Sequence, residues 1–128
     1  MAIKQSDMLA QLSSPGLKRG GILKRLRGTL KEAKAIEELT RPAERLVALG
    51  FDANLNLATS SQLSKYQIVH FATHGVLDAA NPEYSALVFS LFDPTGKPRL
   101  GYLYLQDIYN LTLPAELVVL SACDTGLG

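Results

Sequence analysis

Two apolar runs in the second half of the chain have the pattern of buried strands. Residues 67–73 carry apolar side chains on both predicted faces, Ile68 and Phe71 among them, and residues 117–122 read LVVLSA. Parallel strands that helices cover on both faces show such patterns. Each run breaks into a glycine-bearing turn. We therefore expect two buried strands whose carboxyl ends meet at one edge of an open parallel sheet.

The pattern ahead of these strands predicts an amphipathic helix. Thr29 and Glu32 have the spacing of a capping box, and apolar residues follow at helical intervals as far as Leu39. Pro42 should end this helix near Thr40, since proline cannot continue the hydrogen-bond ladder.

Shorter elements are predicted between the two apolar runs. Residues 86–89 and 102–105 have the pattern of two hairpin arms, and residues 93–96 (DPTG) suit a type I turn between them. Residues 106–111 favour a short helix. Residues 46–49 fit either a strand or a helical turn.

Length and composition indicate one small soluble domain. The chain has 128 residues, of which 47% are hydrophobic and 20% charged, as in ordinary globular α/β proteins. No apolar stretch approaches the roughly 20 residues of a membrane span, and no signal peptide is evident. The single cysteine cannot form an internal disulfide, so we expect a cytoplasmic protein. Residues 1–28 lack periodicity and are interpreted as a leader or linker, with the domain at residues 29–128.

Charge is distributed unevenly along the chain. Residues 1–50 hold ten Lys/Arg and five Asp/Glu, a net of +5, whereas residues 51–128 hold three and seven, a net of −4. A basic stretch of this kind fits either a nucleic-acid arm or a solvated leader and helix face. No aromatic residue interleaves the basic ones, so we expect no nucleic-acid partner. The clustered basic residues are Lys18, Arg19, Lys24, Arg25, Arg27, Lys31 and Lys34.

The candidate chemistry lies where the two apolar runs end. His74 follows the first run and Cys123, about fifty residues later, follows the second. A thiol beside an imidazole has the residue types of a cysteine nucleophile with its base. The backbone amides of Gly75 and Cys123 could then form an oxyanion hole. From spacing alone, a small buried cysteine and a structural histidine explain these residues somewhat better than a dyad does.

Residues near His74 and Cys123 allow three other interpretations: a metal site, a serine nucleophile and a turn residue. His70 and His74 are four apart and could bind a metal together with Cys123 or Asp78, but these ligands are too few for a structural zinc site, so we expect no metal. His70 is expected to be a hydrogen-bonded core residue. Ser121 as the nucleophile of a small hydrolase is disfavoured because it lies inside the strand and should point elsewhere. Asp124 fits a turn residue. No glycine-rich phosphate loop is present, so we expect no cofactor.

Two motifs give the chain a family resemblance. Residues 66–75 (YQIVHFATHG) and 117–128 (LVVLSACDTGLG) closely resemble the CHAT domain, a caspase-like family related to separase. The similarity runs from about residue 23 to the end. It implies a cysteine peptidase with Cys123 as nucleophile, His74 as acid/base, and the Gly75 and Cys123 amides as the oxyanion hole. It also implies a three-layer α/β/α sandwich with a mainly parallel sheet, and a polypeptide substrate or protein partner.

The chain departs from this family at both ends. A CHAT domain continues past the cysteine motif with elements that wall the specificity pocket, whereas this chain ends five residues after Cys123. The family's first strand has no counterpart in residues 1–28. We therefore expect a partial domain, truncated and inactive alone, with open sheet edges that favour self-association. The alternative is a non-catalytic interaction module that associates through those edges.

Overall fold

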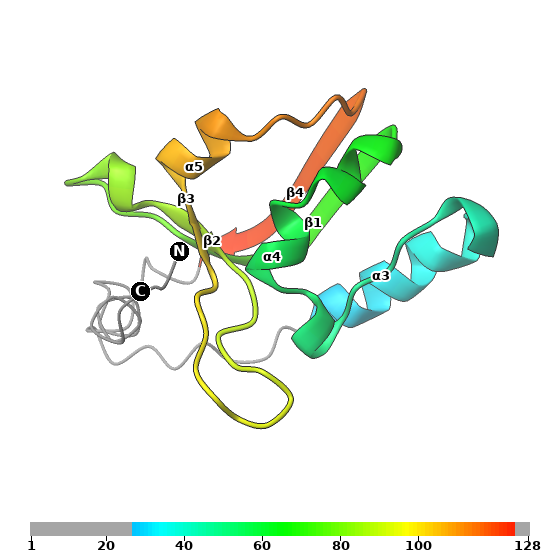
Figure 1. Cartoon of the computed structure of the whole chain (residues 1–128), viewed down its shortest axis with the longest axis horizontal. Helices are drawn as coiled ribbons and strands as arrows, with labels where there is room; N and C mark the ends of the chain where they lie inside the picture. Colours follow the sequence, from blue (N-terminus) through cyan, green and yellow to red (C-terminus); the bar gives the residue numbers. More distant parts are fainter. Residues whose placement is uncertain (1–26, 125–128) are drawn as a thin grey trace.

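The computed structural model describes residues 27–124, in which four strands form one mixed sheet in the order β3-β2-β1-β4 (Figure 1). The strands are β1 (Ile68–Val76), β2 (Ala86–Val88), β3 (Tyr102–Tyr104) and β4 (Leu117–Asp124). β1 pairs with β4 in parallel, whereas β2 is antiparallel to both of its neighbours. The predicted α/β class is confirmed. The prediction of a mainly parallel sheet is wrong, because two of the three strand pairs are antiparallel.

A hairpin accounts for the antiparallel half of the sheet. Antiparallel strands need only a short connection, whereas parallel strands need a long crossover. The predicted turn at residues 93–96 is present, since the Gly96 amide donates to the Asp93 carbonyl at 3.0 Å. Gly96 has a φ of 84°, which favours glycine. The predicted hairpin arms at residues 86–89 and 102–105 are confirmed as β2 and β3.

The His-bearing strand is longer than its apolar pattern indicates. β1 reaches Val76, three residues past the predicted end at residue 73. Residues 74–76 stay extended because β2 pairs with them along the edge that β4 does not occupy. His74 therefore lies inside a strand and not at a break in the chain.

Helices contact both faces of the sheet. α3 (Arg27–Glu38) contacts β1 on the face that holds His70, and α5 (Leu105–Asn110) lies over the face that holds Leu87. Leu87 pairs with Gly75, an odd number of residues from His70, so the two faces are opposite. Figure 1 shows the two helices on opposite sides of the sheet. α5 confirms the helix predicted at residues 106–111.

The predicted capping box is wrong. α3 begins at Arg27, so Thr29 lies inside the helix and is not its N-cap. The Glu32 carboxylate accepts a hydrogen bond from Ser121. The helix ends at Glu38, close to the predicted position, and the Thr40 hydroxyl donates to carbonyls of the last turn at 3.2 and 3.3 Å.

Short helices connect the remaining elements. They are η1 (Pro42–Glu44), η2 (Gly50–Asp52), α4 (Leu55–Ala58), η3 (Ser61–Lys65) and η4 (Pro82–Tyr84). Residues 46–49 adopt neither the strand nor the helical turn considered for them. None of the helices within residues 27–124 has the length and apolar character needed to cross a bilayer. The predicted leader, apart from residues 27 and 28, lies outside the described residues.

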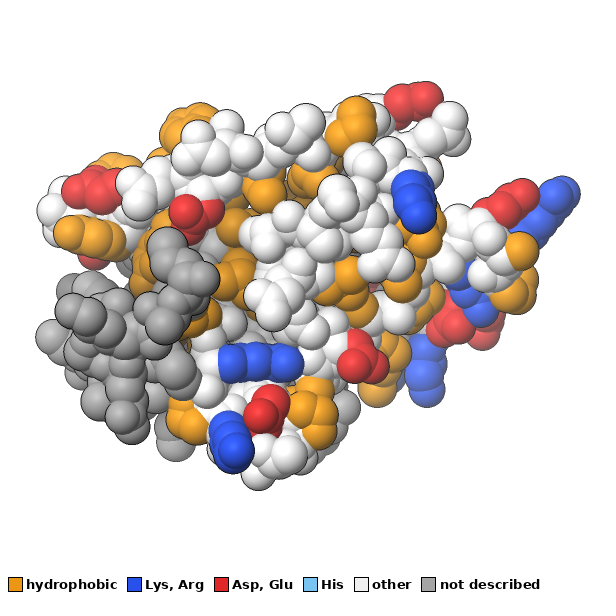
Figure 2. All heavy atoms as spheres, in the orientation of Figure 1, with side chains coloured by type: hydrophobic (Ala, Val, Ile, Leu, Met, Phe, Trp, Pro, Cys, Tyr) orange, Lys and Arg blue, Asp and Glu red, His pale blue; other side chains and the backbone are white. Residues whose placement is uncertain are grey.

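The hydrophobic core is centred on the hairpin. Tyr102 and Leu103 are 2% and 1% exposed, and Tyr102 clusters with Ala86 and Val88. Away from the hairpin, the buried apolar side chains among the described residues are Ala58, Leu63 and Val69. The prediction that β1 and β4 are both buried strands is wrong, because Ile68, Leu117 and Leu120 are 62%, 50% and 57% exposed. Figure 2 shows hydrophobic side chains across the middle of one face, while most charged side chains lie toward its periphery. The sheet is therefore best packed where β2 and β3 meet.

Candidate functional site

His74 and Cys123 occupy paired positions on adjacent strands. The parallel register of β1 and β4 runs from Ile68–Leu117 to Gly75–Asp124, and it pairs His74 with Cys123. Neighbouring strands lie about 4.8 Å apart, and paired positions share one face of a sheet. The backbone thus brings together the two residue types from which sequence analysis built a dyad.

The residues predicted to form an oxyanion hole are also on these strands. Gly75 follows His74 within β1, where it pairs with Leu87 on one side and Asp124 on the other. Gly75 and Cys123 are therefore one register step apart on neighbouring strands. Their role as hydrogen-bond donors to a substrate oxygen stays a prediction.

A polar cluster lies on the same face, toward the amino ends of the two strands. His70 Nε2 is 3.0 Å from Ser121 Oγ, and Ser121 Oγ donates to Glu32 Oε1 at 2.9 Å. His70 Nε2 and Glu32 Oε1 are 3.4 Å apart. The side chains of His70 and Glu32 are 17% and 41% exposed. The cluster joins β1, β4 and α3.

This cluster tests two expectations about single residues. His70 was predicted to be a hydrogen-bonded core residue; the hydrogen bond is confirmed, whereas the side chain is 17% exposed and not fully buried. The expectation that Ser121 points elsewhere is wrong, because residues two apart in a strand lie on the same face and Ser121 lies two before Cys123. The bond of Glu32 to Ser121 was not predicted, because the spacing of Thr29 and Glu32 indicated a capping box. The strand period of two was the signal for Ser121, and no local signal identified Glu32.

The spacing of His70 and His74 had raised the question of a metal site. Among the residues whose side chains the structure describes, 28–121, no group of three or more His, Cys, Asp or Glu residues is placed to hold a metal ion.

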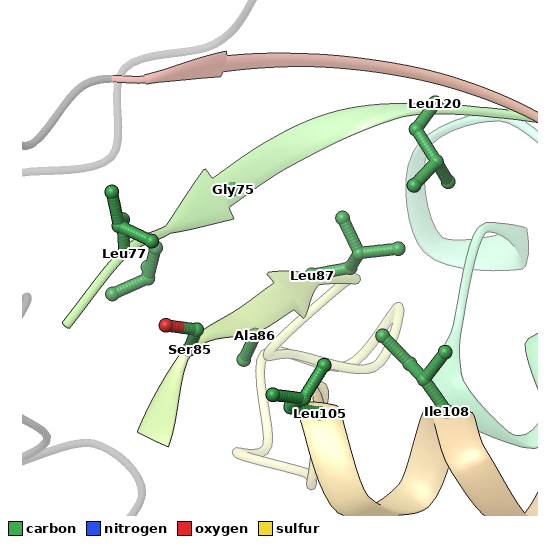
Figure 3. A pocket seen from close by; sticks show the side chains of 9 residues that line it. Gly75, Leu77, Ser85, Ala86, Leu87, Leu105, Ile108 and Leu120 are labelled. Carbon is green, nitrogen blue, oxygen red and sulfur yellow. The ribbon is translucent and has the colours of Figure 1, made fainter. Parts of the chain in front are cut away.

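The opposite face of the sheet holds an apolar cavity of about 270 Å³ between the strands and α5. In Figure 3, Leu87, Leu105, Ile108 and Leu120 converge on it from β2, α5 and β4. Ser85 is the one polar side chain among its nine lining residues, so the cavity contains no group for acid–base chemistry. Its lining residues are Gly75, Val76, Leu77, Ser85, Ala86, Leu87, Leu105, Ile108 and Leu120.

The family described as the CHAT domain matches residues 2–128, which include both strand-ending motifs as well as most of the stretch interpreted as a leader. Neither the search of curated proteins nor the search of solved structures gave a match.

Proposed function

The chain belongs to the CHAT domain family, which is caspase-like and related to peptidases, and from this we propose that it acts on polypeptides as a cysteine endopeptidase domain. The proposed dyad is His74 and Cys123. The observation that supports it most is the pairing of these two positions on adjacent parallel strands. No other thiol competes for the role of nucleophile, since Cys123 is the only cysteine in the chain.

In the proposed reaction, His74 takes the proton of the Cys123 thiol, and the thiolate attacks the carbonyl carbon of the peptide bond. The C–N bond then breaks as His74 returns that proton to the leaving amine. Water hydrolyses the resulting thioester, which restores the thiol and releases the new carboxylate. Such a nucleophile divides one difficult step into two easier ones, and a positioned base contributes about 10²–10⁴ in rate.

The proposed oxyanion hole requires a Gly75 amide that is free to donate to the substrate. Gly75 has a strand on each side, so its amide points toward a neighbouring strand. We propose that the pairing at Gly75 opens when substrate binds, which frees the amide to donate to the tetrahedral oxyanion. Loss of one such donor typically raises the barrier by about 2.7–4 kcal/mol.

The reactivity of the single thiol tests the dyad directly. We expect the rate of Cys123 alkylation by iodoacetamide, measured against pH, to give a midpoint below the ordinary thiol value of about 8.5. His74→Ala should return the midpoint to about 8.5, whereas Ser64→Ala, which removes a hydroxyl bonded to the nearby Ser61 carbonyl, should leave it unchanged. A wild-type midpoint of 8.5 would contradict the dyad.

Peptide cleavage tests the complete reaction. We expect cleavage of a fluorogenic peptide mixture to be slow, because within residues 27–124 the β4 edge next to Cys123 has no neighbouring strand. Any cleavage should disappear in Cys123→Ala and in His74→Ala. Activity that survives both substitutions argues against the proposed mechanism.

The same edge supports a second candidate function, association with another copy of this chain. β4 holds eight residues without proline or lysine, and Leu117, Val118 and Leu120 are 50%, 42% and 57% exposed. Edge strands of monomeric proteins are usually interrupted by such residues or covered. An antiparallel pair of β4 strands around a two-fold axis at Leu120 would place Leu120 against its own copy. It would also join the two apolar cavities, which Leu120 lines.

The oligomeric state distinguishes this second function from the first. We expect a dimer in sedimentation velocity at micromolar concentration and a monomer for Leu120→Lys. The control is Leu39→Lys on α3, where the side chain is already 86% exposed. A wild-type monomer across the concentration range would rule out association through β4.

A further inference from the structure

The cluster of His70, Ser121 and Glu32 lies on the same face of the sheet as the proposed dyad. His70 precedes His74 by four residues in β1, and Ser121 precedes Cys123 by two residues in β4. Even separations keep all four positions on one face. The cluster therefore lies beside the dyad on the same two strands, and Glu32 adds a third element, α3.

Its hydrogen bonds have one consistent arrangement of protons. An ionised carboxylate only accepts, so the Ser121 hydroxyl donates its single proton to Glu32. The Ser121 oxygen must then accept from His70, which places a proton on His70 Nε2. Because its proton is already held by the carboxylate, Ser121 is a bridge between His70 and Glu32. This arrangement argues against Ser121 as a nucleophile.

The contact between His70 and Ser121 also depends on strand register. Ser121 pairs with Ala72, so its bond to His70 runs diagonally across the two strands. A slip of one residue would move Ser121 to the opposite face of the sheet, away from His70 and Glu32. The same slip would separate His74 from Cys123. The cluster and the pairing of His74 with Cys123 therefore require the same register of β1 and β4.

We propose that His70, Ser121 and Glu32 are positioning residues of the active site, which hold β1 and β4 in the register that pairs His74 with Cys123. This inference rests on the proposed dyad. The Glu32 carboxylate, fixed on α3, contributes because it ties the serine to an element outside the sheet. A network with members on three elements resists both sliding of β4 and its separation from β1.

Alkylation of Cys123 in the 128-residue chain tests this role, because the rate reports on one thiol alone. Ser121→Ala should move the midpoint of the pH profile toward 8.5 and lower the rate at pH 6.5 by about tenfold, the change that a shift of one pH unit produces. Ser121→Thr keeps the hydroxyl and should stay within about twofold of wild type. Ser64→Ala is the matched serine control, since its hydroxyl bonds only locally, to the Ser61 carbonyl.

Glu32→Gln gives the second arm of the test, with Glu38→Gln on the same helix as its control. We expect a smaller fall in rate for Glu32→Gln, because the amide oxygen still accepts from Ser121. An unchanged pH profile in a folded Ser121→Ala chain would overturn the positioning role. So would a profile for Ser121→Thr that matches Ser121→Ala, since both results mean that the hydroxyl is not needed.

Hydrogen exchange separates failure of this inference from failure of the dyad. If the wild-type midpoint is 8.5, the dyad fails, yet the register role still predicts faster amide exchange in β4 for Ser121→Ala than for Ser121→Thr. Exchange in β2 and β3 should stay unchanged, because the bonds of the cluster join β1, β4 and α3. Equal β4 exchange in both variants would overturn the register role whatever the chemistry of Cys123.

Discussion

The Ser121 hydroxyl lies 2.9 Å from the Glu32 carboxylate, although the two residues are 89 positions apart in the chain. This bond attaches α3, in which none of the side chains of residues 28–38 is fully buried, to the sheet. The stability of α3 therefore depends on polar contacts as well as on apolar packing.

Loss of the Glu32 carboxylate should consequently destabilise the fold. We expect Glu32→Ala to lower the free energy of unfolding by about 1–2 kcal/mol, since it removes a half-exposed charged acceptor. Glu38→Ala, on the exposed side of α3, should change it by less than about 0.5 kcal/mol. Urea denaturation measures both. In the double mutant with Ser121→Ala, a coupling energy near zero would show that the contact contributes nothing to stability.

Gly101 should not tolerate a side chain. A Cβ at this position would lie 2.8 Å from the Phe89 carbonyl oxygen and from Leu91 Cδ2. We expect Gly101→Ala to cost about 1–3 kcal/mol, because the hairpin must shift to accept the methyl group. Gly28→Ala in α3 is the matched control, with nothing within 4 Å, and should stabilise by up to about 1 kcal/mol. Equal thermal midpoints for the two variants would contradict this reading of the hairpin.

Removal of the Tyr102 hydroxyl should not destabilise the protein. Among the residues whose side chains are described, 28–121, this buried hydroxyl has no hydrogen-bond partner, and such a group costs about 1–3 kcal/mol. We therefore expect Tyr102→Phe to equal or exceed wild type in thermal stability. Leu103→Ala, next in the strand and 1% exposed, should lose about 2–5 kcal/mol. A clear loss of stability in Tyr102→Phe would mean that the hydroxyl has a partner.

The turn at Asp93 should respond to acid. The Thr95 hydroxyl donates to the Asp93 carboxylate at 2.6 Å and the Lys97 amide at 3.0 Å, and these bonds lower the pKa of Asp93 from its ordinary value of 3.8. The folded state then holds this carboxylate in its charged form more strongly than the unfolded chain does. Its contribution is present above about pH 3.8 and is lost as the pH falls through the lower folded pKa.

Two measurements check this response. The difference in thermal midpoint between wild type and Asp93→Asn should shrink from pH 6 to pH 2. In an NMR titration, Thr95→Val should raise the pKa of Asp93, because it removes the hydrogen bond that lowers this pKa most. A difference in midpoint that is constant with pH would mean that the folded and unfolded pKa values of Asp93 are equal.

Local patterns predicted the local elements of this fold. The turn at residues 93–96, the hairpin arms and α5 each depend on a few consecutive residues, so their signals were readable in the sequence. The mix of parallel and antiparallel strand pairs could not be predicted from local patterns, because it depends on β2 pairing with the end of β1. That same pairing extended β1 through His74.

The candidate site shows the same division. The apolar runs and the strand period placed His74 and Cys123 at equivalent points of two strands, and the register of β1 and β4 brings those points together. Glu32 was predicted to be part of a capping box because Thr29, three residues earlier, has the spacing of that motif. Its partner in the structure lies in another element, and no short-range pattern reports such a contact.

The parallel pairing of β1 with β4 has a consequence for the order of folding. The β2–β3 hairpin closes a short loop, whereas Gln67 and Glu116, at the start of the β1–β4 pair, are 49 residues apart. Closure of a longer loop costs more chain entropy, so contacts between distant segments form more slowly. We expect the hairpin to form first and β4 to join β1 last. A partly folded chain then holds Cys123 apart from His74, its proposed base, so the proposed dyad would form only in the last step of folding.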